Sequence, residues 1–185
     1  MQGEVDHLSR LSDQLLILAR ADAGALVPAK EGVDVADFLH ETAARWEGVA
    51  DERGTRVDVS APSTGQMEGD PALLRRVLDN LIDNALRHAP QGTAVALRGY
   101  AADGGWNIDV ADQGPGVAPD HRDRLFTRFA RSDSARSPEN GGAGLGLALS
   151  AAIARAHGGT LESVVNDAPG ALFRLHIPHR RSAHP

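Results

Sequence analysis

Three short segments in a fixed order constrain this chain more than any other feature of its sequence. The first is Asn80–Ala85 (Asn-Leu-Ile-Asp-Asn-Ala), the second Asp112–Gly116 (Asp-Gln-Gly-Pro-Gly), and the third Gly142–Leu147 (Gly-Ala-Gly-Leu-Gly-Leu). Glycine-rich turns let a ligand approach the backbone closely, and the third segment opens a predicted helix, whose N-terminal amides favour phosphate. Each segment alone is weak evidence, and the weight of the three comes from their occurrence together in this order.

In this order, the segments resemble the N, G1 and G2 boxes of the histidine-kinase ATP-binding domain, in the superfamily shared with gyrase, Hsp90 and MutL. The resemblance covers about residues 34–178. It implies an α/β two-layer sandwich, with a mixed sheet of about five strands packed on three helices and preceded by an N-terminal helix. It also implies ATP and Mg²⁺ as ligands and protein-histidine kinase activity in two-component signal transduction.

The first segment lies on a helix that we expect to begin at Asp70-Pro71, since Asp is a favoured N-cap and Pro is tolerated at the first helical position. At about 100° per residue, the polar side chains fall within a third of the circumference, beside an apolar stripe. Ordinary boundary residues would show the same pattern. The resemblance implies that Asn84 binds the metal, that Asn80 lies beside it, and that Arg87 and His88 reach the phosphates.

Asn80 also separates two activities. The related ATPases carry Glu at the matching position, where it is a general base for water, and an amide cannot accept that proton at pH 7. The sequence therefore favours a kinase over a hydrolytic ATPase.

Asp112 ends a predicted strand from Trp106 and shares the parity of its apolar residues, so its carboxylate should point inward. A buried carboxylate needs a partner. The resemblance implies that this partner is the amino group of adenine. An Asx-turn into Gly114 is the structural alternative.

The segment Leu125–Phe129 resembles the F box of the same family, within a short helix expected at about 120–130. Phe126 and Phe129 are equally consistent with a core position, and Arg128 and Arg131 with solvent exposure or phosphate contact. Residues 132–142 are polar, as expected of a mobile lid. The resemblance implies catalytic roles for Asn80, Asn84 and Arg128, a metal role for Asn84, and nucleotide contacts from Asn80, Asn84, Arg87, His88, Asp112, Gly114, Gly116, Val117, Phe126, Arg128, Arg131, Gly142, Gly144, Leu145, Gly146 and Leu147.

Apolar residues at three- and four-residue spacing predict an N-terminal amphipathic helix over residues 4–23, with Gly24 as its C-cap. Its apolar stripe is expected at Val5, Leu8, Leu11, Leu15, Leu16 and Ala19. The stripe either packs on the following domain or is half of a helical pair, since the sequence resembles the end of the second helix of a histidine-kinase dimerisation domain. We therefore expect a dimerisation remnant at 1–24, a linker at 25–32, a catalytic domain at 33–178 and a disordered tail at 179–185.

The composition of the chain limits the classes of partner and the covalent links that it can form. A net charge of −6 gives no overall attraction to nucleic acid, and the absence of cysteine excludes disulfides. The resemblance implies a cytoplasmic domain, whose parent is a homodimer with a response-regulator partner and is either anchored in the bacterial inner membrane or free of it. No histidine here lies in the family's phosphoacceptor motif, so we expect a fragment that binds ATP without autophosphorylating. A nucleotide-gated interaction module and a slow ATPase are the alternatives.

Overall fold

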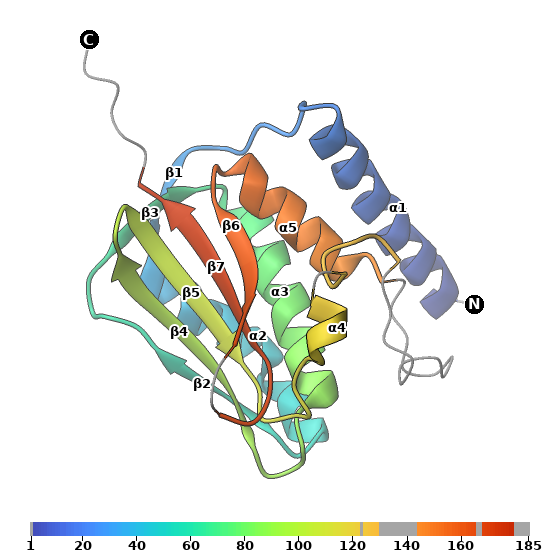
Figure 1. The fold of residues 1–185 in the computed structure, drawn as a ribbon, viewed down its shortest axis with the longest axis vertical. Helices are drawn as coiled ribbons and strands as arrows, with labels where there is room; N and C mark the ends of the chain where they lie inside the picture. The colour runs from blue at the N-terminus through green and yellow to red at the C-terminus, as the bar shows by residue number, and fades with distance from the viewer. Residues whose placement is uncertain (1, 123, 130–143, 166–167, 180–185) are drawn as a thin grey trace.

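The computed structural model describes residues 2–122, 124–129, 144–165 and 168–179, and Figure 1 shows their arrangement. The elements follow one another as α1 (Gln2–Asp22), β1 (Glu31–Asp34), α2 (Val35–Glu52), β2 (Arg56–Ser60), β3 (Gln66–Gly69), α3 (Pro71–His88), β4 (Ala94–Ala102), β5 (Gly105–Ala111), α4 (Pro119–Arg122), α5 (Gly146–Ala156), β6 (Thr160–Val164) and β7 (Leu172–Pro178).

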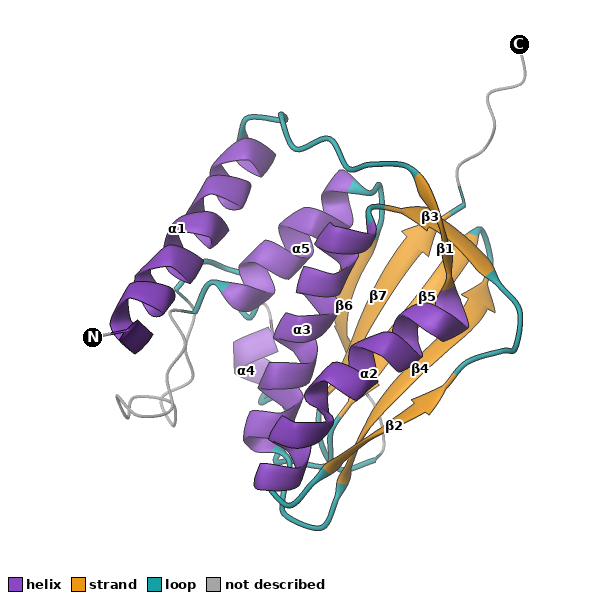
Figure 2. Ribbon diagram, turned by 180° about the vertical axis from the view of Figure 1, so that it is seen from behind, coloured by secondary structure: helices purple, strands orange, loops and turns teal. Residues whose placement is uncertain are grey.

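The main sheet has five strands in the order β2-β4-β5-β7-β6. The β2–β4 pair is parallel and the other pairs are antiparallel. Helices α2, α3 and α5 cover one face of this sheet, as Figures 1 and 2 show from opposite sides. The predicted two-layer α/β sandwich, with a mixed five-stranded sheet on three helices, is confirmed.

Alternation along the strands builds the core between these layers. Val95 and Leu97 of β4 and Ile108 of β5 point toward the helices and are fully buried. The helices meet them with apolar stripes, and the stripe predicted for α3 is buried throughout. Asp34 and Asp70 cap α2 and α3 by accepting hydrogen bonds from backbone amides in the first turn, and the Asp70 cap is the one predicted from the sequence.

The opposite face of the sheet carries a cross-strand row of charges. Arg98, Asp109, Arg174 and Glu162 are aligned in register on β4, β5, β7 and β6. The Arg174 guanidinium donates to both Asp109 carboxylate oxygens at 2.8 Å, and its hydrogen bond to Asp109 raises its pKa above the usual arginine value. A carboxylate that is only 7% exposed is thereby neutralised on the face without helices.

Helix α1 packs on α5, on the side of α5 away from the sheet (Figure 1). Leu18 is its buried anchor, and Leu11, Ile17 and Ala21 are partly buried against the core. The apolar stripe predicted for this helix is therefore wrong in part, because it included exposed residues and left Leu18 out; the exposed ones are Leu8, Leu15 and Leu16.

Two further local predictions need correction. Residues 120–130 do not form one helix: α4 ends at Arg122, and turns follow at 124–129. The end of the predicted linker is a strand, since β1 pairs antiparallel with β3 in a small second sheet. Trp106 ties this sheet to β5, because its indole nitrogen donates to the carbonyl of Gln66 at 3.0 Å.

Candidate nucleotide site

Asn80 joins helices α3 and α5 by hydrogen bonds beside the predicted site. Its Nδ2 donates to the Gly146 carbonyl and to the Ser150 hydroxyl, each at 3.2 Å. Both acceptors belong to the first turns of α5, so the Asn-box residue of α3 directly adjoins the third glycine-rich segment. The fold therefore brings two of the three predicted segments into contact.

Asn84 lies one turn further along α3 and is half-buried. Its side chain makes no hydrogen bond to any residue that the structure describes. A carboxamide in this state offers a hard oxygen, which is the kind of ligand that Mg²⁺ takes alongside phosphate oxygens. Asn84 therefore fits the metal role that the resemblance implies.

Arg87 and His88 are exposed at the end of α3. The Arg87 guanidinium forms an ion pair with Asp83, one turn back on the same helix. The predicted phosphate-facing role would therefore require this side chain to leave Asp83.

Asp112 is the buried carboxylate of the site, at 5% exposure. Its Oδ1 accepts the Gly114 amide at 2.8 Å and the Ala171 amide at 3.2 Å. The Asx-turn alternative is thus present, yet it occupies one oxygen only. Oδ2 accepts no hydrogen bond from the described part of the chain, and so it remains available to a donor on a ligand.

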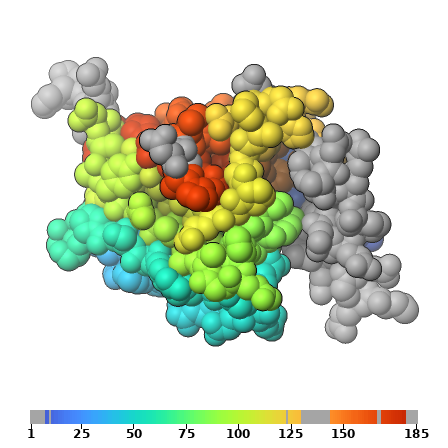
Figure 3. Space-filling view, turned by 60° about the horizontal axis from the view of Figure 1, so that its bottom comes forward, coloured from blue at the N-terminus to red at the C-terminus, as the bar shows by residue number. Residues whose placement is uncertain are grey.

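The backbone around Asp112 has no room for side chains. A Cβ at Gly114 would lie 2.6 Å from the His88 carbonyl oxygen, and one at Gly170 would lie 1.9 Å from the Asp112 carbonyl oxygen. Gly170 also has a φ of 101°, which favours glycine. The loop after β5 is thereby pressed between the end of α3 and the β6–β7 connection, and Figure 3 shows these segments gathered on one face.

The F-box segment joins this arrangement through two contacts. Phe126 packs edge-to-face on Phe173, with ring centroids 6.4 Å apart. The Phe129 amide donates to the Gly144 carbonyl at 2.9 Å, although the Phe129 side chain is 66% exposed and its φ is 60°. The helix predicted over these two residues is therefore wrong, because the chain forms turns at 124–129.

Arg128 directly precedes Phe129 in the sequence. It forms an ion pair with Asp22, the last residue of α1. The pair is largely exposed, which makes it a weak and exchangeable interaction.

The third glycine-rich segment opens α5. Leu145 is the N-cap residue and offers no side-chain hydrogen bond to the first amides of the helix, so within the described residues no side-chain cap competes with an anion for these amides. The side chains of Leu145 and Leu147 instead pack into or against the core, as does that of Val117. Arg131, Gly142 and the lid predicted at 132–142 lie outside the described residues, as does the predicted tail beyond His179.

Sequence reasoning missed three participants. Ser150, Gly170 and Asp22 each contact a predicted site residue from a distant part of the chain. A glycine after Asn166-Asp167-Ala168-Pro169 is a turn signal, but nothing in the sequence indicates that this turn lies on Asp112. Among the described residues, no helix is long and apolar enough to cross a bilayer.

Comparisons with known proteins agree with this geometry. Residues 69–181, more than half of the chain, match the family described as histidine kinase-, DNA gyrase B-, and HSP90-like ATPase. The sensor histidine kinase CusS of Escherichia coli O157:H7 is 36% identical over 177 residues, which are 96% of this chain and 36% of CusS. The chain thus spans about a third of that relative's length.

Solved structures extend the likeness to the whole fold. The histidine kinase AdeS of Acinetobacter baumannii superposes with a TM-score of 0.81 at 26% identity, over 97% of this chain and 82% of that one. Full-length ShkA, solved in complex with AMPPNP, gives 0.80 at 31% identity over 95% of this chain and 37% of its own. The chain therefore belongs to the histidine kinase-, DNA gyrase B- and HSP90-like ATPase family, as a catalytic ATP-binding domain of the histidine-kinase type.

Proposed function

We propose that this chain is the catalytic part of a two-component sensor kinase, which binds Mg-ATP and transfers the γ-phosphoryl group to a histidine on a dimerisation helix. The observation that carries the proposal is the Asp112 carboxylate, which is buried, held at Oδ1 by two backbone amides, and free at Oδ2 among the described residues. A fixed acceptor of this kind suits the amino group of adenine and opposes the carbonyl of guanine.

Each remaining side chain of the site has a role consistent with its surroundings. Asn84 would hold Mg²⁺, which supplies charge neutralisation to the phosphates. The uncapped amides of α5 would receive the phosphate oxygens, with Arg87 and Arg128 exchanging their carboxylate partners for phosphate. Such catalysis consists mainly of positioning and charge stabilisation.

The contacts of Asn80 support transfer over hydrolysis. Its Nδ2 is used in joining α3 to α5, and its carboxamide has no basic group that could remove a proton from water. Asn80 therefore cannot act as a general base at this position. Its presence favours transfer of the γ-phosphoryl group to a protein over transfer to water.

We further propose that residues 1–24 are the remnant of the second dimerisation helix, 25–32 the linker, whose last two residues begin β1, and 33–178 the catalytic domain. One side of α1 packs on α5 and the other exposes Leu8, Leu15 and Leu16, which suits pairing with a further helix. A homodimeric parent, a response-regulator partner and a cytoplasmic location follow from the same assignment.

Calorimetry with Mg-ATP and Mg-GTP tests the nucleotide assignment. We expect the unmodified chain to prefer ATP, and equal affinities would overturn the proposal. Transfer is tested separately by mixing the chain and labelled ATP with a polypeptide that carries the parent's phosphoacceptor helix. Acid-labile, base-stable label should appear on that polypeptide and not on the chain alone, while label on neither, with ATP bound, would reject the kinase role.

A further inference from the structure

Asp70 joins three separate segments at the end of the molecule opposite the predicted phosphate site. Its Oδ1 accepts the amides of Ala72 and Leu73, each at 3.0 Å, which caps α3. Its Oδ2 accepts the amide of Ala29 at 3.0 Å, 41 positions earlier in the chain. Its own amide donates to Nε2 of His157 at 3.0 Å, which ties α3 to the end of α5. Only the bond to Ala29 reaches the segment between α1 and the catalytic domain.

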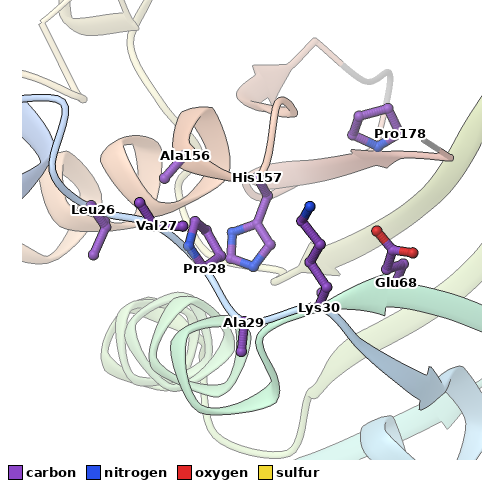
Figure 4. A pocket seen from close by; sticks show the side chains of 10 residues that line it. Leu26, Val27, Pro28, Ala29, Lys30, Glu68, Ala156, His157 and Pro178 are labelled. Atoms are coloured by element: carbon purple, nitrogen blue, oxygen red, sulfur yellow. The ribbon is translucent and has the colours of Figure 1, made fainter. Parts of the chain in front are cut away.

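That segment has few other attachments. Val27 is 80% exposed, and Ala29 and Lys30 are exposed as well, whereas Leu26 packs partly against the core. A cleft of about 170 Å³ lies alongside, between the segment, Glu68 of β3 and the end of α5 (Figure 4). The segment therefore does not fill the space against the domain, and among the described residues it is attached by the packing of Leu26 and by the charge-assisted hydrogen bond from Ala29 to Asp70.

We propose that the Asp70 carboxylate is the anchor that fixes the segment between α1 and the catalytic domain, and so acts together with the packing of α1 on α5 to set the position of α1 relative to the nucleotide site. Asp70 is thus a positioning residue, and its role in phosphoryl transfer rests on the function proposed above. The anchor acts by geometry: Oδ1 organises α3, while Oδ2 holds the chain that leads to α1. Breaking the bond at Ala29 alone would free the connection without disturbing the nucleotide site.

The ionisation of Asp70 is consistent with a permanent anchor. Burial on its own raises the pKa of this carboxyl, but the amides of Ala29, Leu73 and Ala72 and the nearby His157 outweigh it, so the pKa lies below the ordinary value. Lys30 and Glu68 are the other charged residues that line the adjoining cleft. The carboxylate therefore stays charged at neutral pH, and its grip on Ala29 does not depend on small changes in pH.

The variant Asp70→Asn separates the two halves of this carboxylate. An asparagine keeps its oxygen for the α3 cap, at which Asn and Asp are about equal, and turns an NH₂ group toward the Ala29 amide. Asp34→Asn is the matched control, because Asp34 also caps a helix but its carboxylate accepts hydrogen bonds from Asp37 and Gln66 instead of from the segment at 25–30. In hydrogen exchange followed by NMR, the Ala29 amide should exchange about tenfold faster in Asp70→Asn, as expected for the loss of one charge-assisted hydrogen bond. It should change less than twofold in Asp34→Asn.

Pulsed EPR measures the consequence for α1. The chain has no cysteine, so cysteines at exposed Asp13 of α1 and exposed Ala44 of α2 can carry spin labels without background. We expect a narrow distance distribution in the labelled chain without further substitution and in Asp34→Asn. In Asp70→Asn, we expect an added, broader population. Ala29→Pro, which removes the donor and leaves the α3 cap intact, should reproduce that broad population.

Three results would overturn the proposal: unchanged Ala29 exchange in Asp70→Asn, a distance distribution in Asp70→Asn as narrow as in the unmodified chain, or equal broadening in the Asp34 control. The affinity of each variant for Mg-ATP should stay within about twofold of that of the unmodified chain, because the variants leave the contacts of the nucleotide site in place. If the unmodified chain binds no ATP, the proposed function is rejected, and the EPR result remains an independent test of the anchor.

Discussion

At the scale of single residues, the two oxygens of Asp112 have different tasks, and this permits a sharper test than truncation. An asparagine at 112 would keep its oxygen for the Gly114 and Ala171 amides and place an NH₂ group where Oδ2 now lies. We expect Asp112→Asn to lower ATP affinity about 10- to 100-fold, since a donor would face the donor of adenine. GTP, whose carbonyl accepts, should bind better than to the parent. If the ratio of the calorimetric affinities for ATP and GTP is the same in the variant as in the unmodified chain, Asp112 does not recognise the base.

Asn84 is predicted to act through the metal. Because its carboxamide has no hydrogen bond to the described residues, Asn84→Ala should cost little stability and remove most of the Mg²⁺-dependent gain in ATP affinity. Asn107→Ala is a suitable control, since this asparagine contacts His176 on the opposite face of the sheet. Thermal stabilisation by ATP should be measured with Mg²⁺ and with EDTA. If both variants keep the same metal-dependent increment, Asn84 is not a ligand.

How far the sequence predicts such residues depends on how local their partners are. Asn80 could be placed beside a pocket from helical periodicity, but its hydrogen bonds run to residues 66 and 70 positions away. For Asp112, the two alternatives drawn from the sequence are not exclusive, because a carboxylate has two oxygens. The contact of Gly170 with Asp112 joins separate hairpins and has no counterpart in local sequence.

At the scale of elements, α1 offers a direct comparison between its two sides. Leu18 is 3% exposed against α5, whereas Leu15, one turn earlier, is 48% exposed. We expect Leu18→Ala to lower the unfolding free energy by about 2–5 kcal/mol if α1 unfolds with the domain. Leu15→Ala should lower it by less than about 0.5 kcal/mol. Urea unfolding at low protein concentration measures both, and equal losses would show that α1 does not pack as described.

Periodicity explains why this helix and the segment after α4 were predicted less well than α3. Residues 15–18 are Leu-Leu-Ile-Leu, so apolar side chains point in almost every direction and the sequence cannot select the buried side. Phe126 and Phe129 have helical spacing, yet the Phe129 amide bonds to Gly144 and the chain turns instead. Helix α3 was predicted well because its cap, its proline and its single apolar stripe all agree.

At the scale of the whole molecule, acid sensitivity should include a contribution from Asp70. Its folded pKa lies below the unfolded value of about 3.9, so its stabilisation is complete above that value and is lost as the pH falls through the folded pKa. Removing the cap in Asp70→Ala should cost about 1 kcal/mol at pH 7. The difference between parent and variant should shrink at pH 3. Urea unfolding at both pH values measures it, and a difference that does not vary with pH would refute the assignment.

The hydrogen bond between Phe129 and Gly144 has a consequence for how such a domain can diversify. These two residues are separated by positions 130–143 in the sequence, yet the Phe129 amide nitrogen lies 2.9 Å from the Gly144 carbonyl oxygen. The entropy of closing a loop rises only with the logarithm of its length, by about 0.6 kcal/mol for each doubling. We therefore expect insertions and deletions between Phe129 and Gly144 to change the stability of the sandwich little, so that related domains can differ in length here while the surrounding architecture is inherited unchanged.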